Sequence, residues 1–297
     1  MKFLTINGKL QRNANGQFIT VPDNYDNELL TLNGKLLKTS AGLIGNKYKP
    51  AKGDTNYITF TGESSDFTLK AKNKEWDGTV EYSTDRNTWT EWDGSEISSS
   101  GKKLYLRGSG NTTFRTKRGA QFVLSARAAC SGNIQTLLEY SNPPAAMADS
   151  CYQGMFYNCT NLTAAPALPA TTLTPGCYQN MFYRCTNLVQ APELPATTLA
   201  NDCYRGMFNG CTSLTVAPEL PATILASYCY QSMFNGCTSL KISTTQSSEY
   251  PTAWRIPSSG TIPSKASNWN ISMLKGTGGT FTSNPNRNTT YYGAWTK

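Results

Sequence analysis

Nine cysteines are the residues of this 297-residue chain whose type and spacing first suggest chemistry, because thiolates bind metals, form disulfides and act as nucleophiles. Eight of them form two columns with a period of 26 residues: Cys151, Cys177, Cys203 and Cys229, then Cys159, Cys185, Cys211 and Cys237. The chain has no histidine, and no two cysteines have CxxC spacing. The columns therefore predict buried structural thiols, with no metal site.

Paired carboxylates are the other chemistry to consider, because a hydrolase acting on polysaccharide needs a general acid and a general base. Asp149, Glu193, Asp202 and Glu219 occupy repeat positions with no evident inward-facing pair. We therefore expect no enzymatic activity, no catalytic residues and no cofactor.

The elements that carry the cysteines are repeated blocks. The block CYQGMFYNCTNLTAAPALPATTLTPG begins at Cys151, recurs from Cys177 and Cys203, and is truncated in the copy from Cys229. A repeat of this length indicates stacked units, each of which cannot bury its apolar side alone. The sequence thus predicts a solenoid.

Within each block the apolar residues predict a short helix. In the first block they are Cys151, Tyr152, Met155, Phe156 and Cys159. At 100° per residue they occupy an arc of about 140°. Two cysteines eight residues apart on a helix are separated by about 12 Å, which excludes a disulfide between them. Because Pro166 and Pro169 forbid helix further on, we expect each unit to consist of strand, turn and helix.

The blocks resemble the BspA-type leucine-rich repeat in the segments MFYNCTNL at 155–162, MFYRCTNL at 181–188, and MFNGCTSL at 207–214 and 233–240. The unit is longer here than the common form and contains a double-proline loop, APELPAT. The resemblance implies a right-handed solenoid used for attachment, and it implies no particular ligand.

Both ends of the array are predicted to be atypical, because terminal repeats must cap an open core. Residues 130–146 read as an incomplete first unit. After an insertion at 243–265, residues 267–281 read as a degenerate last unit, in which Trp269, Met273 and Leu274 align with the Cys, Met and Phe of the other copies. The aromatic tail after it is expected to cover the core.

Residues 51–128 alternate apolar and polar residues between short Gly, Asn and Asp breaks, which predicts an immunoglobulin-like β-sandwich. With the solenoid at 129–297, the chain is expected to have a mixed β and α+β fold. Trp76, Tyr82, Trp89 and Trp92 form a possible carbohydrate platform, although core packing explains at least two of them.

Residues 1–50 carry a second repeat, in which LTINGKL from Leu4 recurs as LTLNGKL from Leu30. The pairs Asn7-Gly8, Asn15-Gly16 and Asn33-Gly34 mark tight hairpins. Such strands are too short for a core of their own. We expect them to dock on another protein or on their own copies in a trimer or dimer.

Charge and hydropathy exclude other classes of protein. The net charge is +8, but the longest basic cluster, Arg115 with Lys117 and Arg118, is too short to follow a nucleic-acid backbone. No segment approaches the roughly 18 apolar residues of a membrane span, and the first residues lack the apolar stretch of a secretory signal. We therefore expect synthesis and folding in the cytosol, with no membrane insertion and no nucleic-acid partner.

The layout resembles fibre or decoration proteins of crAss-like phages of Bacteroides. It implies a structural protein of the virion surface, made in the host cytoplasm and anchored to other virion proteins through residues 1–50. The solenoid would face a glycan or protein of the host surface, and attachment to head or tail stays open. The alternative is a bacterial cell-surface leucine-rich-repeat adhesin whose leader is not in this sequence.

A ligand of the solenoid would bind where otherwise equal units differ. One such column contains Thr163, Val189, Thr215 and Lys241, and a second contains Tyr157 and Tyr183 followed by two asparagines. Arg184 and Arg205 are single departures. The alternative is that all of these are simply solvated positions.

Overall fold

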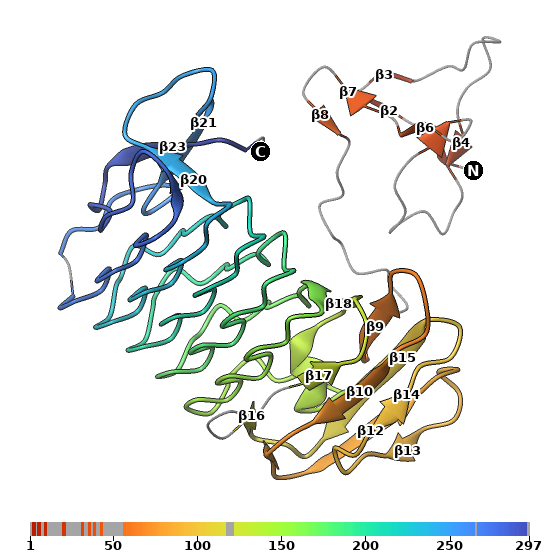
Figure 1. Ribbon diagram of the computed structural model, residues 1–297. Coiled ribbons are helices and arrows are strands. Elements are labelled where there is room, and N and C mark those ends of the chain that lie inside the picture. Colours follow the sequence, from red (N-terminus) through yellow and green to blue (C-terminus); the bar gives the residue numbers. More distant parts are fainter. Residues whose placement is uncertain are drawn as a thin grey trace. The chain divides into compact units, whose positions relative to one another are not determined.

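The chain divides into two compact units, Met1–Thr55 and Asn56–Lys297 (Figure 1). The computed structural model describes residues 56–116, 122–264 and 266–295, and before them only the strands between Lys2 and Leu43.

The strands of the first unit are all two residues long. They are β1 (Lys2–Phe3), β2 (Thr5–Ile6), β3 (Lys9–Leu10), β4 (Thr20–Val21), β5 (Thr31–Leu32), β6 (Lys35–Leu36), β7 (Lys38–Thr39) and β8 (Gly42–Leu43). They form the antiparallel pairs β1–β4, β2–β3, β5–β6 and β7–β8. Ile6 pairs with Lys9 and Leu32 with Lys35, as tight hairpins require. The predicted turn residues Asn7, Gly8, Asn15, Gly16, Asn33 and Gly34 lie outside the described residues.

The second unit begins with strands that share an aromatic core. They are β9 (Ile58–Gly62), β10 (Thr68–Ala71), β11 (Lys74–Trp76), β12 (Thr79–Ser83), β13 (Thr90–Glu91), β14 (Ile97–Ser98), β15 (Lys103–Ser109), β16 (Phe114–Thr116), β17 (Phe122–Leu124) and β18 (Ala128–Ser131). One sheet has the order β13-β12-β15-β9-β18-β19, a second β14-β10-β17, and a third β11-β16. Phe60 of the first sheet and Phe122 of the second are buried, with ring centroids 6.1 Å apart.

The six-stranded sheet continues into the repeats. Its last strand, β19 (Leu162–Ala164), belongs to the first repeat and pairs in parallel with β18. The predicted boundary between residues 128 and 129 falls within β18. Between β18 and β19 in the sequence lies a 3₁₀ helix, η1 (Ile134–Leu137). Its N-cap residue Asn133 accepts a hydrogen bond from the Gln135 N–H.

We call each 26-residue block, and its degenerate equivalent at 267–281, a rung. The helix predicted for Cys151–Cys159 is wrong, because this segment is a chain of turns. The N–H groups of Met155 and Cys159 donate to carbonyls three residues earlier, whereas those of Tyr152 and Phe156 donate to the next rung, at Cys177 (2.8 Å) and Met181 (2.9 Å). A helix would satisfy its N–H groups internally; here half of them join the rungs.

A left-handed backbone conformation at every fourth residue produces these turns. In four rungs the residues with positive φ are Ser150, Gly154, Asn158, Gly176, Asn180, Arg184, Asp202, Gly206, Gly210, Tyr228, Ser232 and Gly236. Glycine has no Cβ to clash in this conformation, and Asn and Asp tolerate it better than most residues. Over nine residues, a period of four places the same side chains inward as a helical period of 3.6, which is why the apolar pattern was ambiguous.

The inward side chains form regular columns. Four buried tyrosines, Tyr152, Tyr178, Tyr204 and Tyr230, stack with ring centroids 5.7–6.0 Å apart. Four buried phenylalanines, Phe156, Phe182, Phe208 and Phe234, stack at 5.4–5.7 Å. All of these pairs are within 8° of parallel. The described part of the chain is therefore nearly all-β, with several sheets and an aromatic and cysteine ladder.

The outer segments of neighbouring rungs pair more sparsely. Thr172 forms a parallel bridge to Thr198, which forms another to Ile224.

Among the described residues, no helix has both the length and the apolar character needed to cross a membrane.

The last rung and the insertion close the far end of the ladder. Trp269, Met273 and Leu274 are buried in the positions predicted for them, and the Tyr230 N–H donates to the Trp269 carbonyl at 2.9 Å. The strands β20 (Lys241–Ser243), β21 (Thr252–Arg255), β22 (Gly278–Gly279) and β23 (Thr290–Gly293) form a sheet of order β21-β23-β20-β22. Tyr291 and Trp295 of the tail are buried, so these aromatics cover the core as expected.

Candidate functional site

All nine cysteines are buried and free, as the column pattern predicts. Burial raises the pKa of Cys159, Cys177 and Cys237 to about 12. The neutral thiol is therefore the form present at physiological pH. Among the described residues, no group of three or more His, Cys, Asp or Glu side chains could hold a metal ion.

One cysteine column links the rungs by hydrogen bonds. The Sγ atoms of Cys185, Cys211 and Cys237 each donate to the carbonyl of a phenylalanine in the preceding rung, and all three distances are 3.0 Å. A thiol that is protonated, buried and bonded to a main-chain carbonyl is a structural group rather than a nucleophile.

The structure brings together the first two side chains of the outward column that begins with Tyr157. The rings of Tyr157 and Tyr183 stack with centroids 4.6 Å apart and planes within 5°. Both side chains are half-buried, and the guanidinium of Arg184 lies 5.4 Å from the Tyr183 ring centroid. Asn209 and Asn235 continue the column and are also half-buried.

Arg184 lies in the neighbouring column, and its backbone conformation is unfavourable for a long side chain. Its φ is +57°, and the positions equivalent to it are Asn158, Gly210, Gly236 and Gly276. A residue with a Cβ loses about 1–2 kcal/mol in this conformation. Arg184 is exposed, and no ion pair joins it to any residue that the structure describes.

Arg205, by contrast, has partners within the repeats. Its Nη1 lies 3.1 Å from the Asp202 carboxylate, and its guanidinium lies 6.0 Å from the ring centroid of Tyr228. Tyr228 also has a positive φ, but its hydroxyl accepts a hydrogen bond from Asn268 Nδ2 at 3.2 Å. These contacts account for both side chains without a ligand.

The second predicted column follows the strands and bridges of the rungs. Thr163 lies in β19 and is half-buried, whereas Val189, Thr215 and Lys241 are exposed. The Thr215 N–H donates to the Val189 carbonyl at 3.1 Å, so these two positions do stack. With Val189 46% exposed, this column mixes apolar, hydroxyl and basic groups without a shared chemistry.

The four carboxylates of the repeats lie on the surface. Asp149, Glu193 and Glu219 are exposed, and Asp202 pairs with Arg205. A general acid and a general base must both reach the bond that is broken, and the described geometry brings no two of these four carboxylates together.

Three aromatics of the predicted carbohydrate platform belong to the core of the sheets. Trp92 is 2% exposed and stacks on Trp76 at 5.5 Å, and Trp76 stacks on Phe114 at 5.0 Å. Tyr82 packs against the same core. At least two of the four were expected to be explained by packing, and this is confirmed.

The fourth aromatic, Trp89, is covered by an arginine that the sequence did not single out. The guanidinium of Arg107 lies 4.0 Å from the Trp89 ring centroid and 4.2 Å from that of Tyr140. Arg107 Nε also lies 2.7 Å from the Glu81 carboxylate. One face of the Trp89 ring is therefore occupied by a side chain of the protein itself.

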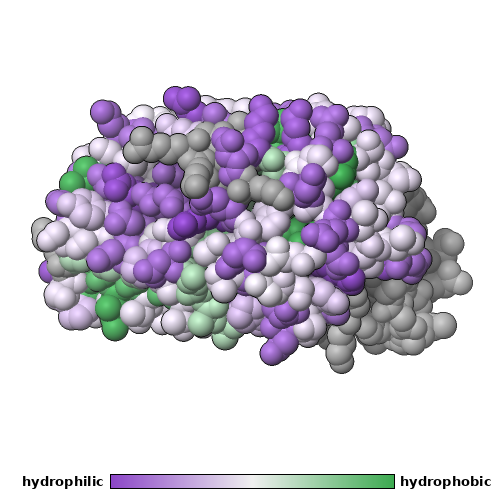
Figure 2. Space-filling model, turned by 90° about the horizontal axis from the view of Figure 1, so that it is seen from below, coloured by the Kyte–Doolittle hydropathy of each residue, from purple (hydrophilic) through white to green (hydrophobic). Residues whose placement is uncertain are grey.

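No protein-family model matches the chain, and no curated protein or solved structure is significantly similar to it. One face of the molecule is mostly hydrophilic, with hydrophobic residues in small separate patches (Figure 2).

Proposed function

We propose that this chain is an attachment protein of a phage virion, either a fibre or a decoration protein of the head or tail. Residues 1–50 join it to other virion proteins, and the repeats are presented to the host surface. The finer fold we propose is an immunoglobulin-like sandwich followed by a leucine-rich-repeat solenoid, in which a ladder of turns replaces the helix.

The observation that carries this proposal is that parts of the same chain pack against the repeats at both ends: the rings of Phe122 and Phe156 lie 5.5 Å apart at one end, and Tyr291 and Trp295 of the tail are buried at the other. Trp254 of the insertion donates its indole N–H to the Pro218 carbonyl at 3.1 Å, and its ring lies 6.3 Å from that of Phe234. Packing of this kind at the ends favours a finished module that displays its sides over one that extends end to end.

The first unit supports the anchoring role. Each of its described sheets has only two strands, and each strand has two residues. Sheets of this size need a further partner for stability in water. Pairing with copies of the chain or with another virion protein would supply it, and a symmetric trimer or dimer is the arrangement we propose.

Electron microscopy of particles labelled with antibodies against residues 56–297, together with mass spectrometry of the purified particles, tests this function. We expect label at the particle surface and loss of incorporation when residues 1–50 are deleted. Particles that lack the protein, while it is found on the surface of the bacterial cell, would overturn the virion role in favour of a bacterial adhesin.

The host-directed role has a separate test. Purified residues 56–297, added in excess, should reduce adsorption of the phage to its host, because the soluble repeats compete for the same surface. Adsorption that is unchanged at saturating protein would show that the repeats are not the attachment surface.

A further inference from the structure

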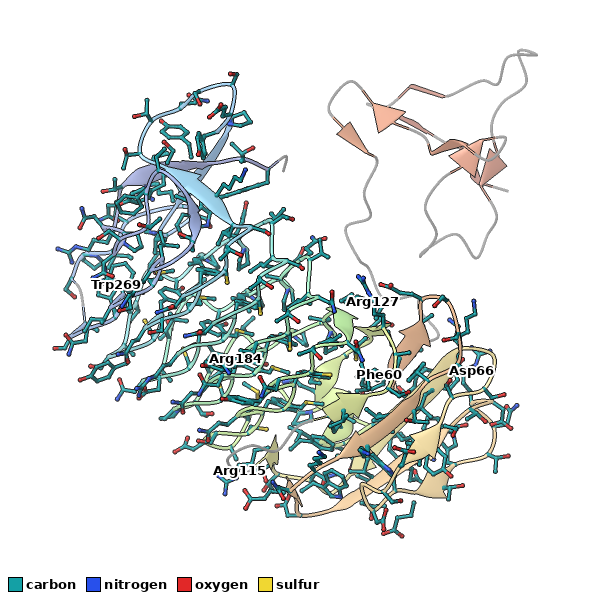
Figure 3. All side chains as sticks on the ribbon, in the orientation of Figure 1. Phe60, Asp66, Arg115, Arg127, Arg184 and Trp269 are labelled. Carbon is teal, nitrogen blue, oxygen red and sulfur yellow. The ribbon has the colours of Figure 1, made fainter. Side chains whose placement is uncertain are left out.

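We propose that Arg184, Tyr183 and Tyr157 form a binding site for a carboxylate-bearing saccharide. This inference rests on the attachment function proposed above and names the chemistry of the ligand. Arg184 lies partway along the repeats, between Phe60 of the sheets and Trp269 of the last rung (Figure 3).

The first argument is the backbone of Arg184. The other rungs place Asn158, Gly210, Gly236 and Gly276 at this position, all with positive φ. A long side chain in a conformation that favours glycine has a local cost in free energy, and such outliers gather at binding sites. Tyr228 is a similar outlier, but its hydrogen bond to Asn268 and its contact with Arg205 explain it.

The second argument is charge. Arg205 is paired with Asp202, whereas the exposed guanidinium of Arg184 has no carboxylate partner among the described residues. Its one described contact is the ring of Tyr183. A guanidinium held against an aromatic ring presents its remaining N–H donors as a planar fork, which matches a carboxylate.

The third argument concerns the groups around this cation. Gln153 Nε2 donates to Gln179 Oε1 at 3.0 Å, and Asn158 is exposed at the position equivalent to Arg184 in the preceding rung. These amides belong to the same two rungs as the tyrosine pair, and amides suit the hydroxyls of a sugar but offer little to an apolar protein segment. The tyrosine pair spans the first two rungs, and the cation belongs to the second. In the third rung, Asn209 takes the place of Tyr183 and Gly210 that of Arg184.

Binding of the full chain to defined saccharides tests the site. The probes are a polyuronate, the same polymer with its carboxyls reduced to alcohols, and the pair sialyllactose and lactose. We expect binding to the acidic member of at least one pair and not to its neutral partner. The polyuronate arm represents a capsule-type source of the carboxylate, and the sialyllactose arm a sialylated glycan.

Arg184→Gly is the informative variant, because it introduces the residue of the third and fourth rungs and relieves the backbone. We expect the affinity for the acidic probe to fall at least about tenfold, the effect of losing a charge-assisted hydrogen bond. The midpoint of thermal unfolding should be unchanged or higher. Tyr183→Asn, which copies Asn209, should also weaken binding.

Lys275→Gln is the matched control, because it removes one positive charge from the last rung at the position equivalent to Tyr183. It should leave affinity unchanged. Wild-type protein that binds neither acidic probe, or an Arg184→Gly variant that binds as tightly as wild type, would overturn the site. If the site is overturned in this way but phage adsorption still depends on the repeats, the attachment function is still supported. If the protein is absent from particles, the virion role is overturned but the saccharide site is not.

Discussion

The Phe114 N–H donates to the Cys151 carbonyl at 2.7 Å, across the junction between the sheets and the first rung. In each later rung, the carbonyl equivalent to that of Cys151 accepts a hydrogen bond from the preceding rung; the Cys177 carbonyl, for example, accepts one from the Tyr152 N–H. A strand of the sheets therefore occupies the position of a missing repeat. The Phe122 N–H, which donates to the Met155 carbonyl at 3.4 Å, extends the same replacement.

Because the sheets cap the repeats, we predict that the two cannot be separated. A fragment of residues 129–297 should be insoluble or bind hydrophobic dyes, since it exposes Phe156 and the other apolar residues of the first rung. Residues 56–297 should unfold in a single cooperative transition, measured by circular dichroism and by tryptophan fluorescence. Two well-separated transitions in the longer fragment would contradict this.

Tyr178 and Tyr152 make a matched pair for a stability test. The Tyr178 hydroxyl is buried without a hydrogen-bond partner in the described structure, whereas the Tyr152 hydroxyl donates to the Ile134 carbonyl at 3.2 Å. Tyr178→Phe should raise the free energy of unfolding by about 1 kcal/mol, and Tyr152→Phe should lower it by about 1 kcal/mol. Denaturant titration measures both changes in the free energy of unfolding. A decrease in both variants would show that the Tyr178 hydroxyl has a hydrogen-bond partner in the folded protein.

The cysteines predict a loss of stability at high pH. Burial raises the pKa of all nine thiols above the usual value near 9, and raises it to about 12 in five of them, for example Cys229. Above pH 9 the unfolded chain loses thiol protons that the folded chain keeps, so the free energy of unfolding falls by up to about 1.4 kcal/mol per thiol and pH unit. This loss begins near pH 9 and continues to about pH 12.

Thermal unfolding between pH 7 and 10.5 checks this effect, with a Cys159→Ala, Cys185→Ala double variant as the control that should show a shallower decline. At pH 7.5 native protein should react with iodoacetamide only as fast as it unfolds. Rapid alkylation of the folded protein would contradict the burial of these thiols.

Gly108 in β15 tests the contact between the sheets and η1. A Cβ at this position would collide with the Leu137 carbonyl oxygen, which also accepts a hydrogen bond from Asn111 Nδ2 at 3.0 Å. Gly108→Ala should cost about 3 kcal/mol, because the atom it meets belongs to the main chain. Gly101→Ala is the control: its φ is +56° but nothing lies near the added atom, so about 1 kcal/mol is expected from the backbone alone.

Several features of the fold were predictable from the sequence because they follow from its period. The 26-residue spacing fixed which residues stack, and the same alignment found Trp269, Met273 and Leu274 in a rung displaced by the insertion. The strands around Asn7-Gly8 were found because two-residue hairpins depend on local turn chemistry.

The turns were missed because five apolar residues in nine satisfy two periods equally well. The deciding signal was present in the polar residues, where Gly154 and Asn158 stand four apart and their equivalents favour the same conformation. Arg184 stands out only once it is known that its position has a left-handed backbone conformation. The enclosure of Arg107 by Trp89 and Tyr140 could not be predicted, since Trp89 and Tyr140 lie 51 residues apart in the sequence and meet only through tertiary packing.

Within the turns, the main-chain hydrogen bonds between rungs run in one direction, from N–H groups such as that of Phe182 to the carbonyl of the following rung, here Met207. Each interior rung thus meets its neighbours through the same donors and acceptors, and neither cap depends on how many rungs lie between them. In-frame duplication or loss of one 26-residue unit would change the length of the molecule by about 4.8 Å and leave both caps intact. Copy number is therefore a property that this architecture allows evolution to vary independently of the two ends.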